Sequence, residues 1–313
     1  GGGGGGAGGG GGGGGGGEGA GGGGGGGLYG RHGIGRWIDE TRSTLRLNPS
    51  YAFAATHEEY RMSALPICED LLLTLDAGVL YVTLNRPDSR NAMSLKMVHE
   101  LRAVFAHLHT QPQVRALVLR GAGGHFCAGG DIKDMAGARS KGIEAFRELN
   151  RAFGSMLEEA QQIPQVLVAV LEGAVLGGGF GLACVSDIAI ASSEAKFGLP
   201  ETTLGILPAQ IAPFVVKRIG LTQARRLALT AARFNGAEAE HLGLVHFSEA
   251  DTEAVETRLQ QVLSQVRQCA PQANAQTKAL LLATETEPLS TLLDRAAEPF
   301  AQAATAPAGS DGP

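Results

Sequence analysis

The chain has 313 residues, and its 26 basic and 31 acidic side chains give a formal net charge of −5 at pH 7. Because no cluster of Lys and Arg outweighs this acidic balance, the composition disfavours nucleic acid as a partner. The four cysteines lie far apart at positions 68, 127, 184 and 269, without the paired spacing of a zinc site. We therefore expect no metal site and a reducing, cytoplasmic setting. No apolar stretch approaches the roughly 20 residues that span a bilayer, so no membrane partner is expected.

The N-terminal part of the chain is dominated by glycine. Residues 1–27 are glycine except for Ala7, Glu18 and Ala20, a composition that buries too little surface to offset the entropy of ordering it. Residues 28–61 follow without a persistent period, and the first methionine is Met62. We interpret residues 1–61 as a disordered, dispensable extension or the product of a wrongly assigned start. A flexible linker or targeting arm is the alternative.

The pattern of a folded domain begins at Ile67. Residues 71–85 predict a hairpin that turns at Asp76-Ala77-Gly78. Ser94 is expected to cap a helix whose apolar residues are Met97, Leu101, Val104 and Leu108. A buried strand at 114–120 leads into a glycine-rich turn at 121–131. A second amphipathic helix is predicted to place one stripe against the core before Pro164 ends it: Ile143, Phe146, Leu149, Phe153, Met156 and Ala160.

The second half of the domain changes from strands to helices. Strands are predicted at 166–171 and 187–191, on either side of another glycine-rich stretch, and helices at 222–232 and 251–269. Strands that alternate with helices indicate an α/β core followed by a helical C-terminal part. We place the core at 62–255, the helical region at 256–302 and a frayed tail at 303–313.

The stretch GAVLGGGFGLA, residues 173–183, contains five glycines directly after a buried strand. Such a cluster implies that bare backbone approaches something closely. A dinucleotide fingerprint fails because Leu182 stands where its third glycine belongs. What remains is a helix N-terminus without side chains, whose free N–H groups suit a developing negative oxygen. GAGGHFCAGGD, residues 121–131, also follows a buried strand and offers a second N–H. The alternative is that both segments are only tight turns.

Four segments together resemble the enoyl-CoA hydratase/isomerase, or crotonase, family: HFCAGGDIKDM (125–135), AVLGGGFGLACVSDIAIA (174–191), AKFGLPETTLGILP (195–208) and RRLALTAARFNGAEAEHLGLV (225–245). The resemblance implies an α/β spiral of ββα units with a helical C-terminal trimerisation region, and a homo-oligomer that is a trimer or a dimer of trimers. It also implies a thioester oxygen bound between two backbone N–H groups. Carried onto this chain, those catalytic donors are Gly130 and Gly178.

The same resemblance implies coenzyme A as part of the acyl-CoA substrate, with no separate cofactor. Backbone near Arg90 and Ala92 is expected to contact the CoA moiety, and Ala128, Asp131 and Ile132 are expected near its adenine. Arg90 is a candidate phosphate ligand, and the alternative is a solvated loop charge. Family chains continue past the equivalent of Phe300 with a helix whose basic residue reaches the CoA. Here the sequence reads AQAATAPAGSDGP, which puts CoA affinity and subunit packing in question.

The catalytic carboxylates depart from the family pattern. Family hydratases hold a water between two glutamates, and the first of these positions is Gly181 in GGGFG. The second is present as Glu201 in FGLPE. Desolvation in an acyl pocket is expected to raise the pKa of Glu201, which suits a single catalytic acid/base. Cys127 is interpreted as a small packed residue rather than a nucleophile. Gln210 and Thr203 are candidates to line the pocket, and the alternative for Gln210 is a bond to helix-start backbone.

The run from Pro200 to Phe234 most resembles family hydratases that act on isohexenylglutaconyl-CoA in acyclic terpene breakdown, with methylglutaconyl-CoA hydratases a close second. Both substrates are branched and carry their own carboxylate, which, directly or through water, we hypothesise partly replaces the missing glutamate. The leading prediction is a lyase that hydrates a branched 2-enoyl-CoA. A double-bond isomerase is the second hypothesis, because isomerases often need one carboxylate. A non-catalytic acyl-CoA-binding paralogue is the third.

Overall fold

A computed structural model describes residues 64–305, and the predicted N-terminal extension at 1–61 lies outside the described residues. Strands β1 (Leu71–Asp76) and β2 (Val79–Leu84) form the predicted antiparallel hairpin. Its two turn residues, Ala77 and Gly78, have φ of 46° and 74°. Two left-handed residues match the twist of the flanking strands, so the hairpin prediction is confirmed.

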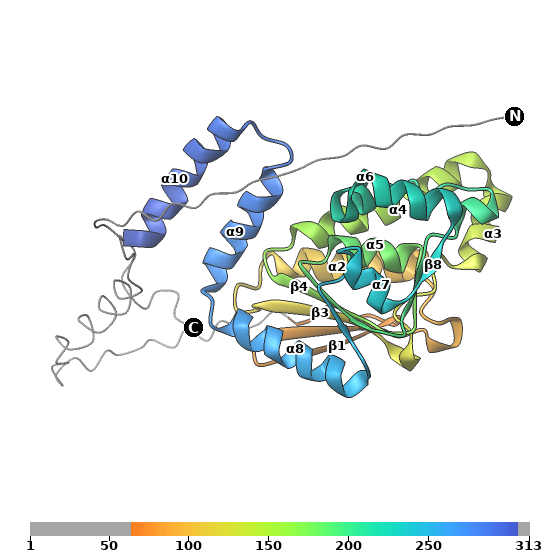
Figure 1. Cartoon of the computed structure of the whole chain (residues 1–313), viewed down its shortest axis with the longest axis horizontal. Coiled ribbons are helices and arrows are strands. Elements are labelled where there is room, and N and C mark those ends of the chain that lie inside the picture. The colour runs from red at the N-terminus through yellow and green to blue at the C-terminus, as the bar shows by residue number, and fades with distance from the viewer. Residues whose placement is uncertain (1–63, 306–313) are drawn as a thin grey trace, which may run out of the picture. The chain divides into compact units, whose positions relative to one another are not determined.

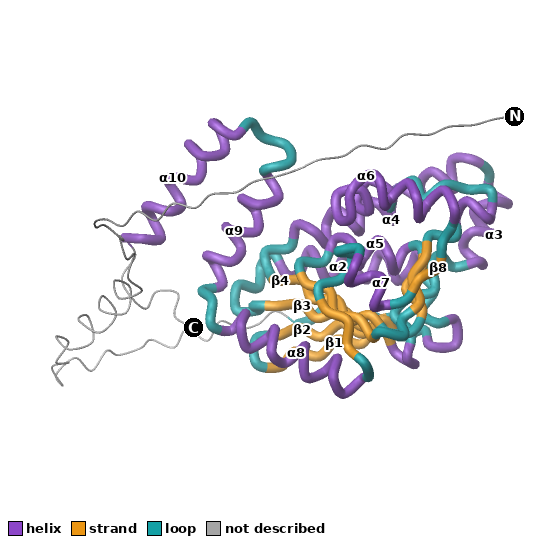
Figure 2. The backbone as a smooth tube through the Cα atoms, viewed as in Figure 1, coloured by secondary structure: helices purple, strands orange, loops and turns teal. Residues whose placement is uncertain are grey.

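Strands are distributed between two sheets. In the larger sheet the order is β1-β2-β3-β4-β6-β9, parallel from β2 onward, with β3 (Ala116–Gly121), β4 (Val166–Leu171), β6 (Ile188–Ser192) and β9 (Phe247–Glu249). The smaller sheet has the order β5-β7-β8, with β5 (Ala174–Leu176), β7 (Lys196–Gly198) and β8 (Arg233–Phe234). Consecutive strands such as β4 and β5, or β6 and β7, therefore enter different sheets. This alternation agrees with the spiral of ββα units that the family resemblance implies. Figure 2 shows the strands, in orange, among the purple helices.

Helices cover both faces of the larger sheet (Figure 1). On one face lie α2 (Leu95–Leu108), α4 (Ile143–Gln162), α5 (Gly178–Val185) and α6 (Ala212–Thr230). Leu80, Leu117 and Leu119 pack into the cluster formed with these helices. The opposite face carries α8 (Thr252–Arg267), whose apolar side chains contact the alternate strand residues, among them Val79, Val118 and Val168. The central strands β3 and β4 are thus buried on both sides, as parallel strands usually are, whereas the edge strand β1 exposes alternate residues.

The two predicted amphipathic helices differ in how far their apolar stripes are buried. Ser94 caps α2 by accepting a hydrogen bond from Met97 N at 3.0 Å, as predicted. In α4 the stripe is buried only toward its C-terminal half, where Met156 and Ala160 are fully covered. Ile143 is 81% exposed, so its predicted core position is wrong. Periodicity predicts which face of a helix is apolar, but it does not show how far along the helix that face is covered.

The helix predicted at 222–232 is the second part of a longer one. Helix α6 spans Ala212–Thr230 and bends at Gly220, whose φ of 76° is left-handed. The remaining short elements are α3 (Ile132–Lys141), α7 (Gly236–His241) and three 3-10 turns, η1 (Pro87–Ser89), η2 (Ala122–Gly124) and η3 (Glu201–Leu204).

The C-terminal helices are α9 (Pro271–Ala283) and α10 (Leu289–Thr305), so helix continues past the predicted boundary at 302. Lys278 on α9 donates to Asp187 Oδ2 at 2.7 Å and to the carbonyl of Gln165 at 3.1 Å. Burial lowers the pKa of Lys278, and Asp187 opposes that shift. Because Asp187 also accepts from Leu167 N, α9 is tied to the starts of β4 and β6. Among residues 64–305 no helix is both long and apolar enough to cross a membrane.

Candidate active site

The two glycine-rich segments lie side by side. Cys127 N donates to the carbonyl of Ala174 at 2.8 Å, and Leu176 N donates to the carbonyl of Cys127 at 2.9 Å. The pair behaves as a short parallel ladder, with an isolated bridge between Cys127 and Val175. This pairing aligns the chain so that residues 128–130 and 176–178 continue together to the same end of the spiral.

The two predicted donors, Gly130 and Gly178, are among the residues at that end whose backbone N–H groups have no carbonyl acceptor within residues 64–305. Met93 pairs with both neighbours of Gly130, since Met93 N donates to Gly129 O and Asp131 N donates to Met93 O. A Cβ placed on Gly178 would lie 3.8 Å from Cβ of Met93, which brings Gly178 to the same spot. Within residues 64–305, the N–H groups of Gly130 and Gly178 donate to no backbone carbonyl. Gly178 opens α5, so the positive end of the helix dipole lies behind its N–H.

Three consecutive glycines of the second segment each meet a different neighbour. A Cβ on Gly177 would lie 3.0 Å from Oε1 of Glu201, and one on Gly178 would lie 2.6 Å from Cζ of Phe153. On Gly179 it would lie 2.8 Å from Cβ and 2.9 Å from the carbonyl oxygen of Cys127. The tight-packing interpretation is therefore confirmed for these three glycines, and the interpretation of the segment as an oxyanion site stays a prediction. The backbone is bare because a carboxylate, an aromatic ring and another backbone all press against it.

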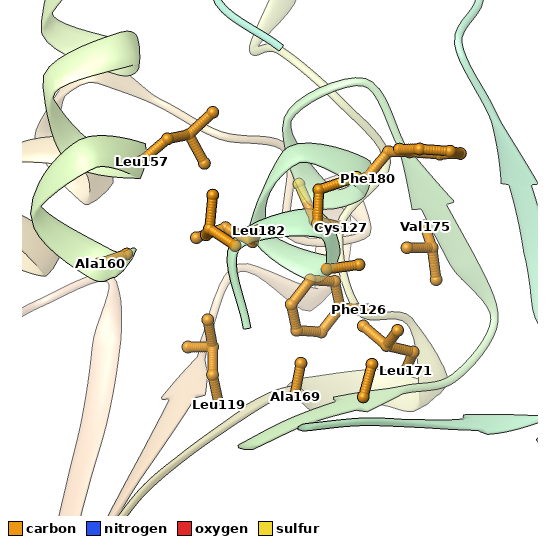
Figure 3. Close-up of a cluster of buried hydrophobic side chains, with 14 of the residues drawn as sticks. Leu119, Phe126, Cys127, Leu157, Ala160, Ala169, Leu171, Val175, Phe180 and Leu182 are labelled. Atoms are coloured by element: carbon orange, nitrogen blue, oxygen red, sulfur yellow. The ribbon is translucent and has the colours of Figure 1, made fainter. Parts of the chain in front are cut away.

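The position of the absent first glutamate is filled by apolar side chains. A Cβ on Gly181 would lie 3.0 Å from Cδ1 of Leu157 and 3.5 Å from Cγ1 of Ile211. Figure 3 shows Leu157 reaching from its helix toward Leu182 in the buried cluster. Apolar side chains thus occupy the space where the first glutamate of the family pattern would lie. Glu201 is left as the acidic group at the second segment.

Glu201 is the first residue of η3 and follows Pro200. Its Oε1 faces Gly177, while its Oε2 is buried and has no hydrogen-bond partner within the described part of the chain. Burial raises the pKa of Glu201, opposed by the glutamate's own N–H and by the positive charge of Arg233. A carboxyl group with one free oxygen and a raised pKa is suited to accept and return a proton near neutral pH.

The positions predicted for CoA lie along one connected edge. Arg90 is exposed and left-handed, with φ of 52°, and its carbonyl accepts from Ala128 N at 3.0 Å. The carbonyl of Ala92 accepts from the guanidinium of Arg86. Ile132 is 83% exposed at the start of α3. Their contact with CoA stays a prediction.

Asp131 belongs to the same edge, but its side chain is fully engaged. Its Oδ1 accepts from Lys133 N at 2.8 Å and Asp134 N at 3.2 Å, which caps α3. Its Oδ2 accepts from Arg86 Nη2 at 2.7 Å. Burial acts to raise the pKa of Asp131, yet the hydrogen bond from Arg86 and those from the two backbone N–H groups hold it below its ordinary value. The backbone of Asp131 is engaged as well, because its N–H donates to the carbonyl of Met93 and its carbonyl accepts from Met135 N. Its contact with CoA stays a prediction.

Sequence reasoning missed Asn91, whose side chain joins the loop at 86–92 to the glycine-rich turn at 121–131. Asn91 is fully buried and left-handed, with φ of 56°. Its Oδ1 accepts from Arg86 N at 2.8 Å, and its Nδ2 donates to the carbonyls of Ala122 and His125 at 2.9 and 2.6 Å. Asparagine tolerates the left-handed region, so an Asn beside Arg90 in a polar loop was the available signal.

Three other side chains singled out in the sequence have defined places. Cys127 is buried, and burial raises the pKa of its thiol to about 11, which confirms the packed interpretation. Thr203 donates to the carbonyl of Pro200 within its own turn. Gln210 accepts from Arg151 on α4, and within residues 64–305 it bonds to no helix-start backbone. No group of three or more His, Cys, Asp or Glu side chains is placed to hold a metal ion in this same range.

Comparison with known proteins decides the family. The model of the enoyl-CoA hydratase/isomerase family matches residues 74–306. The chain belongs to the enoyl-CoA hydratase/isomerase family. Among solved family structures, Pseudomonas aeruginosa AtuE is 71% identical, with a TM-score of 0.76, over 77% of this chain and 94% of that one. An enoyl-CoA hydratase/isomerase from Marinobacter aquaeolei is 57% identical, with the same TM-score and the same coverage of both chains.

Curated family members are more distant. Enoyl-CoA hydratase domain-containing protein 2, mitochondrial, of Mus musculus is 35% identical over 236 residues, which cover 73% of this chain and 78% of that protein. Enoyl-CoA hydratase ACTT6 of Alternaria alternata is 35% identical over 204 residues, 65% of this chain and 66% of that protein. The match thus spans about two thirds of the length of the Alternaria protein.

Proposed function

We propose that this chain hydrates a branched 2-enoyl-CoA, with isohexenylglutaconyl-CoA as the substrate. The observation that carries the proposal is the meeting of three groups: the unused N–H groups of Gly130 and Gly178, and the carboxyl group of Glu201 against Gly177. The thioester oxygen accepts from both N–H groups. As an enolate forms, its charge grows between them, and each such donor contributes about 3 kcal/mol to transition-state stabilisation.

Glu201 performs the proton transfers in this proposal. It removes one proton from a water molecule whose oxygen bonds to C3 of the enoyl group. The electron pair of the C2–C3 double bond moves onto the thioester oxygen as an enolate. When the enolate collapses, Glu201 returns the proton to C2, so the elements of water are added across the double bond. The apolar packing of Leu157 at Gly181 leaves no second carboxyl group to share this work. We propose that the carboxylate of a glutaconyl substrate, directly or through water, partly takes that place.

The first test compares the full-length protein with Glu201→Gln, using crotonyl-CoA, 3-methylglutaconyl-CoA and isohexenylglutaconyl-CoA and identifying products by mass. Wild type is expected to form 3-hydroxyacyl products from the branched esters, isohexenylglutaconyl-CoA above all. Because acid–base catalysis contributes about 10²–10⁴-fold, Glu201→Gln should reduce kcat by about 10³-fold. Glu194→Gln, at an exposed glutamate, is the matched control. Full turnover by Glu201→Gln contradicts the catalytic assignment, and binding without turnover by wild type indicates the non-catalytic paralogue.

The pH dependence gives an independent signature. Glu201 must be ionised to accept a proton, so kcat/KM should fall as pH decreases through its pKa, which burial raises. The folded state therefore binds more protons than the unfolded state between the unfolded and folded pKa values, and stability falls as pH rises through that window. Glu201→Gln should lose this pH limb and be more stable than wild type at neutral pH in urea titrations. Equal stability together with an unchanged limb would place the controlling ionisation elsewhere.

Double-bond isomerisation is a second candidate function. The apolar filling at Gly181 favours chemistry that needs one carboxylate, and a peroxisomal protein of Arabidopsis thaliana named Delta(3,5)-Delta(2,4)-dienoyl-CoA isomerase is 30% identical over 220 residues. Mass separates the two, because isomerisation leaves the product mass equal to that of the substrate.

We also propose a homo-oligomer, a trimer or a dimer of trimers. Large apolar side chains are exposed along the C-terminal helices, including Leu289 at 70% and Phe300 at 75%. Light scattering coupled to size exclusion measures the mass directly. The cytoplasmic location, coenzyme A only as part of the substrate, and a role in acyclic terpene breakdown remain predictions. Relatives named mitochondrial and peroxisomal occur in the same family.

A further inference from the structure

Helix α4 carries a glycine in its interior for which the neighbouring chain gives a reason. Glycine weakens a helix relative to alanine, so an interior one calls for a steric explanation. A Cβ on Gly154 would lie 1.9 Å from Oε1 and 2.8 Å from Cδ of Gln210. Alanine at this position would therefore require the ends of the Gln210 and Arg151 side chains to move. The Gln210 amide occupies the space that a side chain at Gly154 would fill, and we call this space the seat of the amide.

This seat adjoins the candidate active site on both elements that form it. Phe153, the residue before Gly154, rests on Gly178. Ile211, the residue after Gln210, rests on Gly181. The amide of Gln210 is thus one residue away from each of two side chains that cover the helix α5. Both of these side chains contact α5, the helix that begins at the proposed donor Gly178.

The seat is rich in hydrogen-bond donors. Arg151 Nη1 donates to Oε1 of Gln210 at 3.5 Å, which identifies that atom as the acceptor and leaves the amide NH₂ as a donor. Within residues 64–305 this NH₂ group has no hydrogen-bond partner. Arg151 Nη2 also donates to Glu158 at 2.6 Å, and its side chain stays half-exposed at 55%. An amide NH₂ beside a guanidinium is a donor set that matches a carboxylate.

We propose that Gln210, supported by Arg151, binds the free carboxylate of a glutaconyl-type thioester and selects it over uncharged enoyl esters. The inference rests on the proposed function, because it names what recognises the substrate class proposed there. It assigns a role to a side chain for which the sequence left two interpretations open. The carboxylate accepts from the Gln210 NH₂ and from Arg151, while the apolar branch lies against Phe153, which is only partly buried.

The test uses two probes of nearly equal shape, 3-methylglutaconyl-CoA and the methyl ester of its free carboxylate. Gln210→Glu places a carboxylate against the substrate's own, and Arg151→Gln removes the positive charge. Both variants are expected to raise KM for the acid at least tenfold and to leave KM for the methyl ester within about twofold. Arg151→Lys should restore part of the preference. Arg147→Gln removes an exposed, ion-paired arginine from the preceding turn of the same helix and is the matched control.

Titration calorimetry with both probes keeps the inference testable without turnover. A preference for the acid that Gln210→Glu and Arg151→Gln abolish supports it in either assay. Equal losses for acid and ester, or no loss for either, overturn it. If wild type hydrates the acid and both variants keep their preference, the proposed function stands and this inference fails. If wild type binds the acid selectively through these residues but hydrates neither ester, the inference stands and the proposed function fails.

Discussion

The two glycine-rich segments contain five glycines each, but they use them differently. In 173–183, a Cβ on any of the five would come within 3.0 Å of another atom. In 121–131 three positions have room: Gly124 has nothing within 4 Å among the described residues, Gly129 has its nearest neighbour at 3.8 Å, and Gly130 at 3.6 Å. Segment 173–183 is crowded at all five glycines, whereas segment 121–131 is crowded at Gly121 and Gly123 and open at the other three.

The difference separates three reasons for a glycine. Gly179 is needed because backbone packs against it, and Gly124 because its φ of 73° is left-handed. Gly130 meets neither condition, since its φ is ordinary and only Met135 Sδ stands within 4 Å, at 3.6 Å. The room in front of Gly130 is what the proposed thioester site requires. We therefore expect substitutions in 173–183 to lower the unfolding free energy, and a substitution at Gly130 to change substrate binding with little effect on stability.

The largest effect is expected at the closed segment. Gly179→Ala brings a Cβ to within 2.9 Å of the carbonyl oxygen of Cys127, and a backbone atom cannot rotate away. Overpacking of this kind costs about 3 kcal/mol of unfolding free energy, measured by urea titration at 25 °C. An unchanged urea midpoint for Gly179→Ala would show that the two segments can move apart. It would contradict the conclusion that backbone packing requires a glycine here.

A smaller loss is expected at Gly178, where the obstacle is a side chain. Gly178→Ala meets Cζ of Phe153 at 2.6 Å and should cost about 2 kcal/mol. Phe153→Leu removes the ring tip, so the double variant should recover at least half of that loss. A double-mutant cycle on the unfolding free energy measures the coupling. Additive losses would mean that something other than the ring excludes a side chain at Gly178.

The smallest effects on stability are expected at the open segment. Gly124→Ala should cost about 1 kcal/mol, because an L side chain is strained in the left-handed region even with free space around it. Gly130→Ala should change the unfolding free energy by less than about 0.5 kcal/mol. It should nevertheless raise KM for the thioester about tenfold, since the added methyl group stands where the substrate enters. Unchanged kinetics for Gly130→Ala would remove this glycine from the site.

The sequence predicted those elements that are determined by residues close together along the chain. The turn at Asp76-Ala77-Gly78, the Ser94 cap and the buried strand at 166–171 follow from residue type and period, and the structure has all three. Short strands such as β5 and β7 have three residues each, too few for a period to appear. Their existence depends on the partner strand, which single-sequence reasoning does not supply.

The candidate site divides in the same way. Gly130, Gly178 and Glu201 were predicted because they lie in segments that resemble the family. Phe153 on Gly178 and Leu157 on Gly181 were not, since each contact joins residues far apart in the chain. The helical stripe that contains Phe153 was recognised as apolar, but its period does not say which glycine it covers.

The burial of Cys127 has a consequence for the chemistry of thiols in this protein. Oxidants and alkylating reagents attack thiolates, and burial keeps the thiols of Cys127 and Cys184 protonated, with pKa values raised to about 11 and about 12. Cys269, which follows the end of α8, is exposed, whereas Cys68 is half-buried and burial raises the pKa of its thiol. A maleimide dye should therefore label the junction before α9 while sparing the thiol that packs against Gly179. The protein thus carries a reporter position for its C-terminal helices, and its candidate site resists oxidative inactivation through cysteine.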